Sequence, residues 1–389
     1  MSDKPLAGVR VLDLSRLLPG PYCTLVLADL GAEVVKVEDT EGGDYIRAMG
    51  PFVDGQSSYF LALNPGKKSV SLNLKAPAGR GLFLRLAATA RVVVESFRPG
   101  AVDRLGIGYE AVRAVNPGVV YCSISGYGQD GPDRDLAGHD LDFSARAGIL
   151  GLCGRPGQLP TIPPVQIADL SSALFAATGI LAALRESDRT GAGRYLDIGM
   201  LDSALALMVM PVAEYVAGER AGRGRMPLSG KHPCYNVYRT RDGRDISLAA
   251  LERKFWEGFC RKVGRDDLLP LQFSERPEDF TLFEALFASR TAAEWREFLA
   301  GTDFCCGVVP TIEEVFADPQ VAARGLVLPS LPSGPRVTRL GHPLRDRSER
   351  GRRPCPGHGQ HTGEVLGELG LTGPELDALE AAGVVRRGR

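Results

Sequence analysis

The chain has 389 residues, of which 44% are hydrophobic, and its 46 Lys and Arg against 47 Asp and Glu give a formal net charge of −1. This length exceeds what one hydrophobic core usually holds, so we expect two domains. The composition excludes a disordered chain, and the balanced charge argues against nucleic acid or an acidic membrane surface as a partner.

The first residues are polar and run directly into an expected strand, so we expect no signal peptide. We find no apolar run that approaches the roughly 18 residues of a membrane span, and we expect a cytoplasmic protein with no membrane partner. The eight cysteines lack C-x-x-C spacing and nearby histidine ligands. We therefore expect reduced, mostly buried thiols, no metal site and no disulfide framework.

Apolar runs alternate with helical segments over the first 125 residues. We expect strands at 9–14, 33–38, 69–74, 91–97 and 119–125, and helices at 21–30, 77–88 and 109–115. Near-continuous Val, Ile and Leu runs separated by helices are typical of a parallel sheet covered on both faces. The expected fold class is α/β, with a Rossmann-like large domain.

A glycine pattern from Gly126 to Gly131 follows the last of these strands and has the form G-x-G-x-x-G. In a dinucleotide-binding fold a helix starts at this pattern, and an acidic residue follows the second strand. Here Pro132 and three charged residues come next, and no acidic residue stands at the expected distance. We therefore reject the pattern as a dinucleotide fingerprint.

An apolar segment at 170–186 predicts a fully buried helix, with Asp169 at its start in a position that suits an N-cap. A strand at 194–200 and a second apolar helix at 201–216 follow. Residues 1–216 would then form the large domain.

A Gly-, Arg- and Pro-rich stretch at 217–228 is typical of a linker between domains. Expected strands at 235–239 and 245–250, and helices at 254–263, 282–288 and 292–299, indicate a smaller α+β domain over 229–321. The remainder, 322–389, has Pro-rich, turn-rich stretches at 329–335 and 345–359, followed by helices at 362–369 and 373–382. We expect this C-terminal segment to return over the large domain or over a partner subunit.

Two ionisable residues stand out: His139, in a Gly-His-Asp sequence at 138–140, and Asp169. If the fold brings them together, they form an acid–base pair. Each has a structural alternative, because a lone histidine is more often structural and an aspartate at this position can simply cap the helix.

Cationic residues also lie at or near the ends of expected strands: Lys67, Lys68, Lys75, Arg98 and Arg104. Open α/β sheets bind ligands outside the strand tips, and converging ammonium and guanidinium groups would suit a phosphate-bearing ligand. The alternative for each of these residues is solvated surface charge.

A set of segments in a fixed order covers essentially the whole chain: 8–14 with 19–21, 30–38, 67–75, 95–100, 125–132, Asp169 ahead of its helix, and 315–325. These segments resemble the family III CoA-transferases and α-methylacyl-CoA racemases. The resemblance implies an interlocked homodimer that acts on acyl-CoA thioesters, with no cofactor beyond the CoA moiety of the substrate. It places Lys75, Ser96, Phe97, Arg98 and Arg104 on the CoA-binding surface, and residues 17–19, with Leu18 at their centre, beside the thioester.

The two branches of the family differ in what the aspartate does. In the transferase branch the residue matching Asp169 attacks the acyl-CoA and passes through anhydride and aspartyl-CoA intermediates. In the racemase branch it pairs with a histidine in a Gly-His-Asp like that at 138–140, and the two groups move the α-proton through an enolate. His139 therefore favours a racemase acting on 2-methyl-branched acyl-CoA.

Two further features favour the racemase branch. The segment 229–238 lacks the glycine-rich loop of some transferases, and Glu252 resembles a residue that supports the catalytic histidine across the dimer. An ordinary acid at a helix start is at least as good an explanation of Glu252. The alternatives are a CoA-transferase with Asp169 as nucleophile and a CoA-binding protein without turnover.

Overall fold

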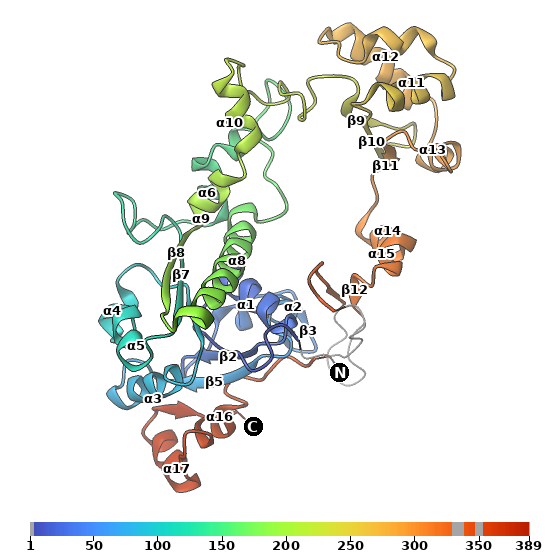
Figure 1. The fold of residues 1–389 in the computed structure, drawn as a ribbon. Helices are drawn as coiled ribbons and strands as arrows, with labels where there is room; N and C mark the ends of the chain where they lie inside the picture. Colours follow the sequence, from blue (N-terminus) through green and yellow to red (C-terminus); the bar gives the residue numbers. More distant parts are fainter. Residues whose placement is uncertain (1–3, 329–337, 347–352, 389) are drawn as a thin grey trace. The chain divides into compact units, whose positions relative to one another are not determined.

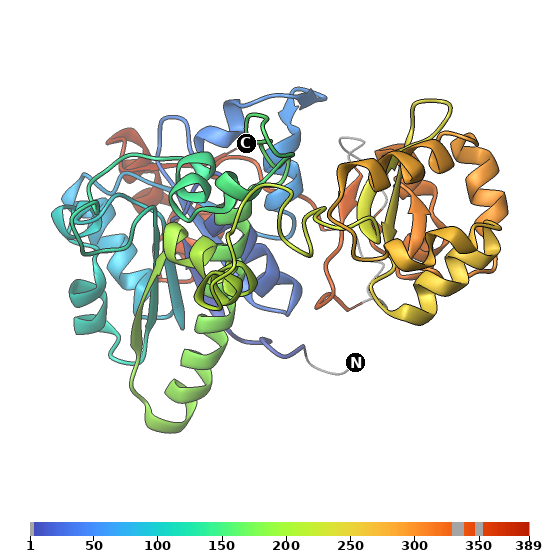
Figure 2. The same ribbon diagram turned by 90° about the horizontal axis from the view of Figure 1, so that it is seen from above.

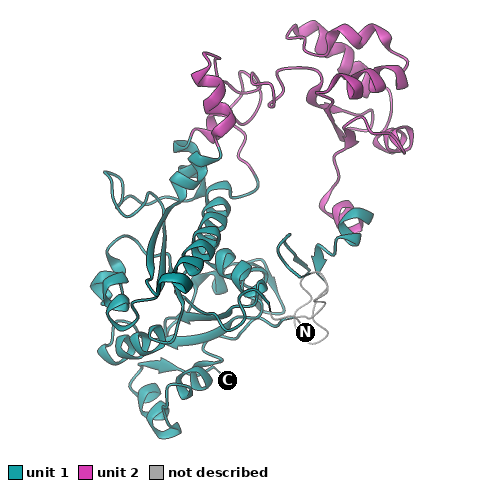
Figure 3. Ribbon diagram, in the orientation of Figure 1, with its two compact units in different colours: residues 1–147, 164–207, 319–389 teal, residues 148–163, 208–318 magenta. Residues whose placement is uncertain are grey.

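The computed structural model describes residues 4–328, 338–346 and 353–388 (Figure 1). They form two compact units (Figure 3): unit 1 comprises Met1–Ala147, Pro164–Leu207 and Pro319–Arg389, and unit 2 comprises Gly148–Pro163 and Met208–Asp318. The Pro-rich stretch expected at 329–335 lies outside the described residues, as do residues 347–352 of the second one. The domain limits expected from the sequence stay a prediction.

Unit 1 is built on a seven-stranded sheet with the order β14-β5-β2-β1-β6-β7-β8. Its parallel strands are β1 (Arg10–Asp13), β2 (Glu33–Glu38), β5 (Lys68–Leu72), β6 (Val92–Glu95), β7 (Val120–Ser125) and β8 (Arg194–Gly199). The edge strand β14 (Val385–Arg386) runs antiparallel to β5. The predicted α/β class with a parallel sheet is confirmed.

Helices cover both faces of this sheet because alternate strand residues point to opposite sides. Leu12 and Val93 belong to one buried core and Val11 and Val92 to the other. The first core receives α3 (Pro77–Ala87), α4 (Ala101–Leu105), α5 (Tyr109–Val115), α16 (Thr362–Gly367) and α17 (Gly373–Ala381), and the second receives α1 (Pro19–Asp29) and α8 (Ile167–Thr190). Strands buried on both sides explain the continuous apolar runs in the sequence.

Helix α8 differs from its prediction in two ways. It begins at Ile167, with Gln166 at the N-cap position, so Asp169 lies in the first turn and is not the cap. It is also only partly buried in this chain, since Leu174 is 49% and Phe175 43% exposed. By length and composition α8 could cross a membrane, contrary to the expectation from the sequence, although half of its apolar window is buried within the protein. Core helices of soluble proteins meet the same criterion, so α8 alone is weak evidence for a membrane segment.

Several elements were not expected or have other limits. The helix expected at 201–216 is broken into α9 (Met200–Ala206) and α10 (Val209–Val216). The sequence analysis did not predict α4, β14 or, in unit 2, η2 (Asp266–Leu271) and β11 (Cys306–Val308). It also did not predict the short elements η1 (Tyr45–Ala48), β3 (Phe52–Val53), β4 (Gln56–Ser57), α2 (Ser58–Leu63), α6 (Asp140–Arg146), α7 (Ile149–Leu152), α14 (Ile312–Ala317), α15 (Pro319–Ala323), β12 (Val327–Leu328) and β13 (Arg339–Leu340). Most of these are too short to carry a periodic apolar pattern.

Unit 2 contains an antiparallel sheet of β9 (Tyr235–Arg239), β10 (Asp245–Ala249) and β11 (Cys306–Val308). Around it lie α11 (Arg253–Lys262), η2 (Asp266–Leu271), α12 (Pro277–Phe287) and α13 (Ala292–Leu299), as Figure 2 shows. Its core is strongly aromatic, and the buried rings are those of Trp256, Phe259, Phe283, Phe287 and Trp295. A small unit with so many large buried rings has its own apolar core.

The C-terminal segment returns to the sheet of unit 1. Val385 pairs with Leu72 across β14 and β5, and both side chains are buried. Val365, Leu366 and Leu376 of the two helices ahead of β14 join the same core. The segment therefore closes one edge of the sheet, which a parallel strand would otherwise leave unpaired.

Candidate active site

The site lies at the point where the strand order of the sheet reverses. The chain goes from β1 to β2 on one side of it and later places β6 on its other side. In open α/β sheets, ligands bind outside the carboxyl ends of the strands at such a point. A cavity of about 610 Å³ opens here, bounded by the loops after β1 and β6, by the end of β7, and by His139 and Asp169.

Asp169 reaches this cavity from the first turn of α8. The helix is capped by a different carboxylate, because Oδ1 of Asp140 accepts hydrogen bonds from the backbone N–H groups of Ala168, at 2.7 Å, and Asp169, at 3.2 Å. These are amides that an N-cap side chain satisfies in many helices. Asp140 thus takes the capping role, and the Asp169 carboxyl does not need to.

The surroundings of Asp169 raise the pKa of its carboxyl to about 7, first through burial and second through the negative charge of Asp140. Both causes disfavour the ionised form. A carboxyl with a pKa near neutrality can give or take a proton at cellular pH, which is what a general acid–base catalyst needs.

His139 immediately precedes α6 and also lines the cavity. Its backbone N–H donates to Oδ2 of Asp142 at 2.9 Å, which fixes the start of the helix, while its side chain is exposed. Because the next residue, Asp140, binds the amide of Asp169, the two candidate residues are held on neighbouring segments. The structure thus brings His139 and Asp169 to one cavity, although they are 30 positions apart.

Two glycines near His139 make room for one aromatic ring. A Cβ atom on Gly126 would lie 2.8 Å, and one on Gly138 2.7 Å, from Cε1 of Phe143. The ring also packs edge-on against Tyr127, with centroids 5.1 Å apart. The first glycine of the G-x-G-x-x-G pattern therefore serves packing beside the cavity, and no helix starts until Asp140.

The residues expected to bind CoA fall into two groups. Ser96, Phe97 and Arg98 follow β6 and line the cavity. Within the described part of the chain, Leu18, Lys75 and Arg104 lie outside the residues that line it. Leu18 instead packs beside the small apolar cluster of Ile46, Phe60 and Leu63.

Lys67 and Lys68 do not face the cavity, and both are used in the framework of unit 1. The ammonium group of Lys67 is fully buried and lies 3.1 Å from Oδ2 of Asp13. Lys68 lies at the amino end of β5, where it pairs with Glu33 at 2.6 Å and Glu364 at 2.8 Å. These two lysines stabilise the fold, so they cannot also be counted as ligands for a phosphate group.

Among the residues that line the cavity, sequence reasoning did not identify Arg16, Tyr45 and Arg134 as candidates. The Arg16 guanidinium carbon lies 5.2 Å from the centre of the Phe97 ring and 6.0 Å from that of Tyr45. Arg16 lies three residues after the end of β1, so the strand-tip rule used for the lysines could have found it. Tyr45 and Arg134 come from irregular segments whose position no periodic pattern indicates. Together with Arg98, the two arginines give the cavity cationic groups suited to phosphates.

Glu252 belongs to unit 2 and occupies the N-cap position of α11. Its side chain is exposed and makes no cap hydrogen bond in the structure. Its expected role toward the histidine involves a second subunit and stays a prediction. Among the described residues, no cluster of three His, Cys, Asp or Glu side chains could hold a metal ion.

Comparison with known proteins decides the family. The family model for CoA-transferase family III matches residues 6–362. The chain belongs to CoA-transferase family III. This family of enzymes acts on acyl-CoA thioesters and includes both transferases and racemases.

Relatives from both branches of the family are equally similar to the chain. It is 35% identical to a succinyl-CoA:glutarate CoA-transferase of Mus musculus, covering 99% of this chain and 91% of the relative. It is 34% identical to an α-methylacyl-CoA racemase of Homo sapiens, covering 98% and 97%. A crystal structure of a CaiB/BaiF family protein from Brucella suis superposes with a TM-score of 0.81 at 31% identity, over 95% of this chain and all of that one. Overall identity therefore does not separate the two branches.

Proposed function

We propose that the protein is an α-methylacyl-CoA racemase-like enzyme that epimerises 2-methyl-branched acyl-CoA thioesters. The observation that carries this proposal is that His139 and Asp169 line one cavity, with the pKa of the Asp169 carboxyl raised to about 7 by burial and by Asp140. Epimerisation needs one group to remove the α-proton and a second group to deliver a proton to the other face. An imidazole and a carboxyl in one cavity can exchange these roles with the direction of the reaction.

The proposed reaction passes through an enolate of the thioester, whose oxygen gains negative charge. Hydrogen-bond donors or dipoles must stabilise that charge. The amides of Ala168 and Asp169 are already bound by Asp140, so the first turn of α8 is a poor source of donors. At the start of α1 the helix dipole can act instead: Pro19 lines the cavity, and although Pro19 and Pro21 have no N–H to donate, the amino end of a helix carries partial positive charge.

A CoA-transferase with Asp169 as nucleophile is the alternative, and the close similarity to succinyl-CoA:glutarate CoA-transferases favours it. A nucleophilic carboxylate must be ionised, and a carboxyl with a pKa of about 7 is ionised in only about half of the molecules at neutral pH. A general base must be ionised as well, so this pKa does not separate the two roles, and it is the presence of His139 in the same cavity that favours proton transfer.

The same proposal covers the partners of the enzyme. Ser96, Phe97 and Arg98 would bind CoA from within the cavity, and Leu18, Lys75 and Arg104 would act at its margins. We propose an interlocked homodimer, in which Glu252 supports the histidine, working in the cytoplasm with no cofactor beyond CoA. Exposed apolar side chains of α10 support a subunit interface; they are Val209, Met210, Val212, Tyr215 and Val216.

Chiral analysis of products tests the assignment. We would incubate one epimer of a 2-methylacyl-CoA with the enzyme, with and without a free carboxylic acid, and repeat this with His139→Ala. We expect epimerisation without any acid acceptor, and we expect its rate to fall by a factor of about 100 or more in the variant. Transfer of CoA to the added acid, largely preserved in His139→Ala, would assign the protein to the transferase branch.

A further inference from the structure

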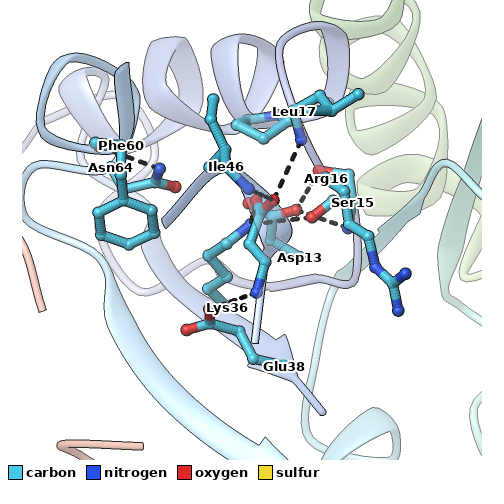
Figure 4. A network of polar contacts seen from close by, with 12 residues as sticks. Asp13, Ser15, Arg16, Leu17, Lys36, Glu38, Ile46, Phe60 and Asn64 are labelled. Atoms are coloured by element: carbon cyan, nitrogen blue, oxygen red, sulfur yellow. Dashed lines mark hydrogen bonds and ion pairs between the residues drawn. The ribbon is translucent and has the colours of Figure 1, made fainter. Parts of the chain in front are cut away.

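A fully buried ion pair lies behind the wall of the cavity. The Lys36 ammonium group, on β2, is 2.9 Å from Oδ2 of Asp44, and neither side chain has any exposed surface. Lys36 also donates to the backbone carbonyl of Ser15 at 2.8 Å. Figure 4 shows this lysine reaching from its strand toward the turn formed by Ser15, Arg16 and Leu17.

Asp13, Asp44 and Ser96 also bind this turn, and we call these three side chains together with Lys36 the clamp. Oδ1 of Asp44 accepts a long hydrogen bond from the Leu17 N–H, at 3.4 Å. Oγ of Ser96 accepts from the Arg16 N–H at 3.1 Å. Asp13 holds Ser15 through its backbone N–H, at 3.0 Å, and through its hydroxyl group. Side chains from three other segments thus bind the backbone of three consecutive residues.

The turn needs such support because its backbone is strained. Leu17 has a φ of 61°, in the left-handed region that residues other than glycine seldom adopt. A strained conformation persists only where the surrounding structure holds it, and such positions cluster at ligand-binding sites. The residues held here, Arg16 and Leu17, line the cavity.

Asp44 also sets a second part of the cavity wall. Its Oδ1 accepts from the Ile46 N–H at 3.1 Å and so caps η1, whose first residue, Tyr45, lines the cavity. The backbone N–H of Asp44 in turn donates to Glu38 at 2.9 Å. The Arg16 guanidinium lies over both Tyr45 and Phe97, so the two parts of the wall meet at that group.

We propose that Lys36 and Asp44 are positioning residues that fix the strained turn 15–17 and η1 in the geometry that binds the acyl-CoA. Neither side chain touches the cavity, so the pair acts through Arg16, Leu17 and Tyr45. Well-packed apolar residues stabilise a protein interior as well as a buried ion pair does, or better. The bond from Lys36 to the Ser15 carbonyl therefore points to a role in holding the turn. The inference rests on the proposed function only in taking an acyl-CoA as the ligand.

The test compares variants that lose the clamp with a matched lysine variant. Lys36→Met with Asp44→Ala removes both charges together, so that no unpaired charge stays buried, and also removes the oxygen that accepts from the Leu17 and Ile46 N–H groups. Lys68→Met is the control, since it breaks the ion pairs with Glu33 and Glu364 at the amino end of β5, whereas the cavity lies at the carboxyl ends of the strands. For each protein we would measure the melting temperature, the dissociation constant of acetyl-CoA by calorimetry, and kcat and KM for an acyl-CoA substrate.

We expect the double variant to bind acetyl-CoA at least tenfold more weakly and to lose kcat/KM to the same extent, mainly through KM. The control should stay within twofold of the wild type in both quantities even if its melting temperature falls. A folded double variant with unchanged affinity would overturn the inference. If the wild type bound no acetyl-CoA, the proposed function would fail instead.

Hydrogen exchange on the wild type covers the case in which the double variant does not fold. The clamp predicts that the amides of Arg16 and Leu17 exchange at least 100-fold more slowly than those of an unstructured peptide, although both residues are partly exposed. Exchange at the unstructured rate would contradict the proposed clamp directly. This readout needs neither ligand nor variant, so it tests the hydrogen bonds of the turn even if acetyl-CoA does not bind.

Discussion

Asp169 and Asp140 both lie at the amino end of α8 but have different roles there. Asp140 accepts hydrogen bonds from two backbone N–H groups in the first turn of α8 and so caps the helix. Burial and the charge of Asp140 raise the pKa of the Asp169 carboxyl, which favours its uncharged form. Carboxyls in different surroundings can take different roles in this way. The arrangement of Asp140 next to Asp169 therefore helps to explain why the Asp169 carboxyl is about half protonated near pH 7.

Asp140→Asn tests the charge of the neighbour. The amide oxygen can still accept the two backbone hydrogen bonds, but the negative charge that raises the pKa of Asp169 is gone. We expect the ionisation of Asp169 in the pH profile of kcat/KM to move down by about 0.5 to 1 pH unit, with the melting temperature nearly unchanged. An unshifted profile would mean that burial alone sets this pKa.

Asp169→Asn should stabilise the protein at alkaline pH while abolishing activity. The pKa of Asp169 is about 7 in the folded state, against 3.8 for a free aspartate side chain. Wild type and variant should therefore be equally stable below pH 4, and the wild type should lose stability as the pH rises from 4 to 7. At pH 8 we expect the variant to be more stable by on the order of 2 kcal/mol, after allowance for solvent screening. Denaturant unfolding at pH 4 and pH 8 measures this, and equal stability at both would contradict the raised pKa.

At the scale of elements, the parallel strands of unit 1 were predictable from their apolar runs, and β2 has the predicted limits. The N-cap prediction for Asp169 was wrong because the cap comes from Asp140, 29 positions away, and no local pattern reveals such a partner. The break in the helix expected at 201–216 was not predictable, because Leu207 and Met208, which separate α9 from α10, are as apolar as their neighbours. His139 and Asp169 could be named from the sequence, but their common cavity depends on tertiary packing.

The glycine loop ahead of α6 provides a test of packing at the cavity. Gly138→Ala would press a methyl group against the Phe143 ring, so we expect a loss of about 1 to 3 kcal/mol and reduced activity, because His139 is the next residue. In a Phe143→Leu background the smaller side chain leaves more room. The added cost of Gly138→Ala should then fall by at least half in urea unfolding, and equal costs in both backgrounds would show that the ring is not the obstacle.

For the whole molecule, the C-terminal segment ties the end of the chain to the sheet that carries the cavity. β14 pairs with β5, and β5 lies beside β2, the strand that bears Lys36. Residues from both ends of the chain therefore share one core. Loss of the last strand would expose a sheet edge, which favours association between chains.

Val385→Ala tests this contribution. Its side chain is 2% exposed, and we expect truncation to cost about 2 kcal/mol in the free energy of unfolding. Arg386→Ala, at the exposed neighbouring position, is the matched control and should change stability by less than about 0.5 kcal/mol. Comparable losses in the two variants would indicate that β14 is held by its backbone pairing alone.

The central claim is that His139 and Asp169 exchange the α-proton of an acyl-CoA thioester. The most direct measurement is mass spectrometry of a single 2-methylacyl-CoA epimer incubated with the enzyme in heavy water, without any carboxylic acid acceptor. We predict incorporation of one deuterium at the α-carbon together with epimerisation, with both reduced about 100-fold or more in His139→Ala and in Asp169→Asn. The absence of deuterium from a substrate that the enzyme binds, together with CoA transfer once an acid is added, would contradict the account.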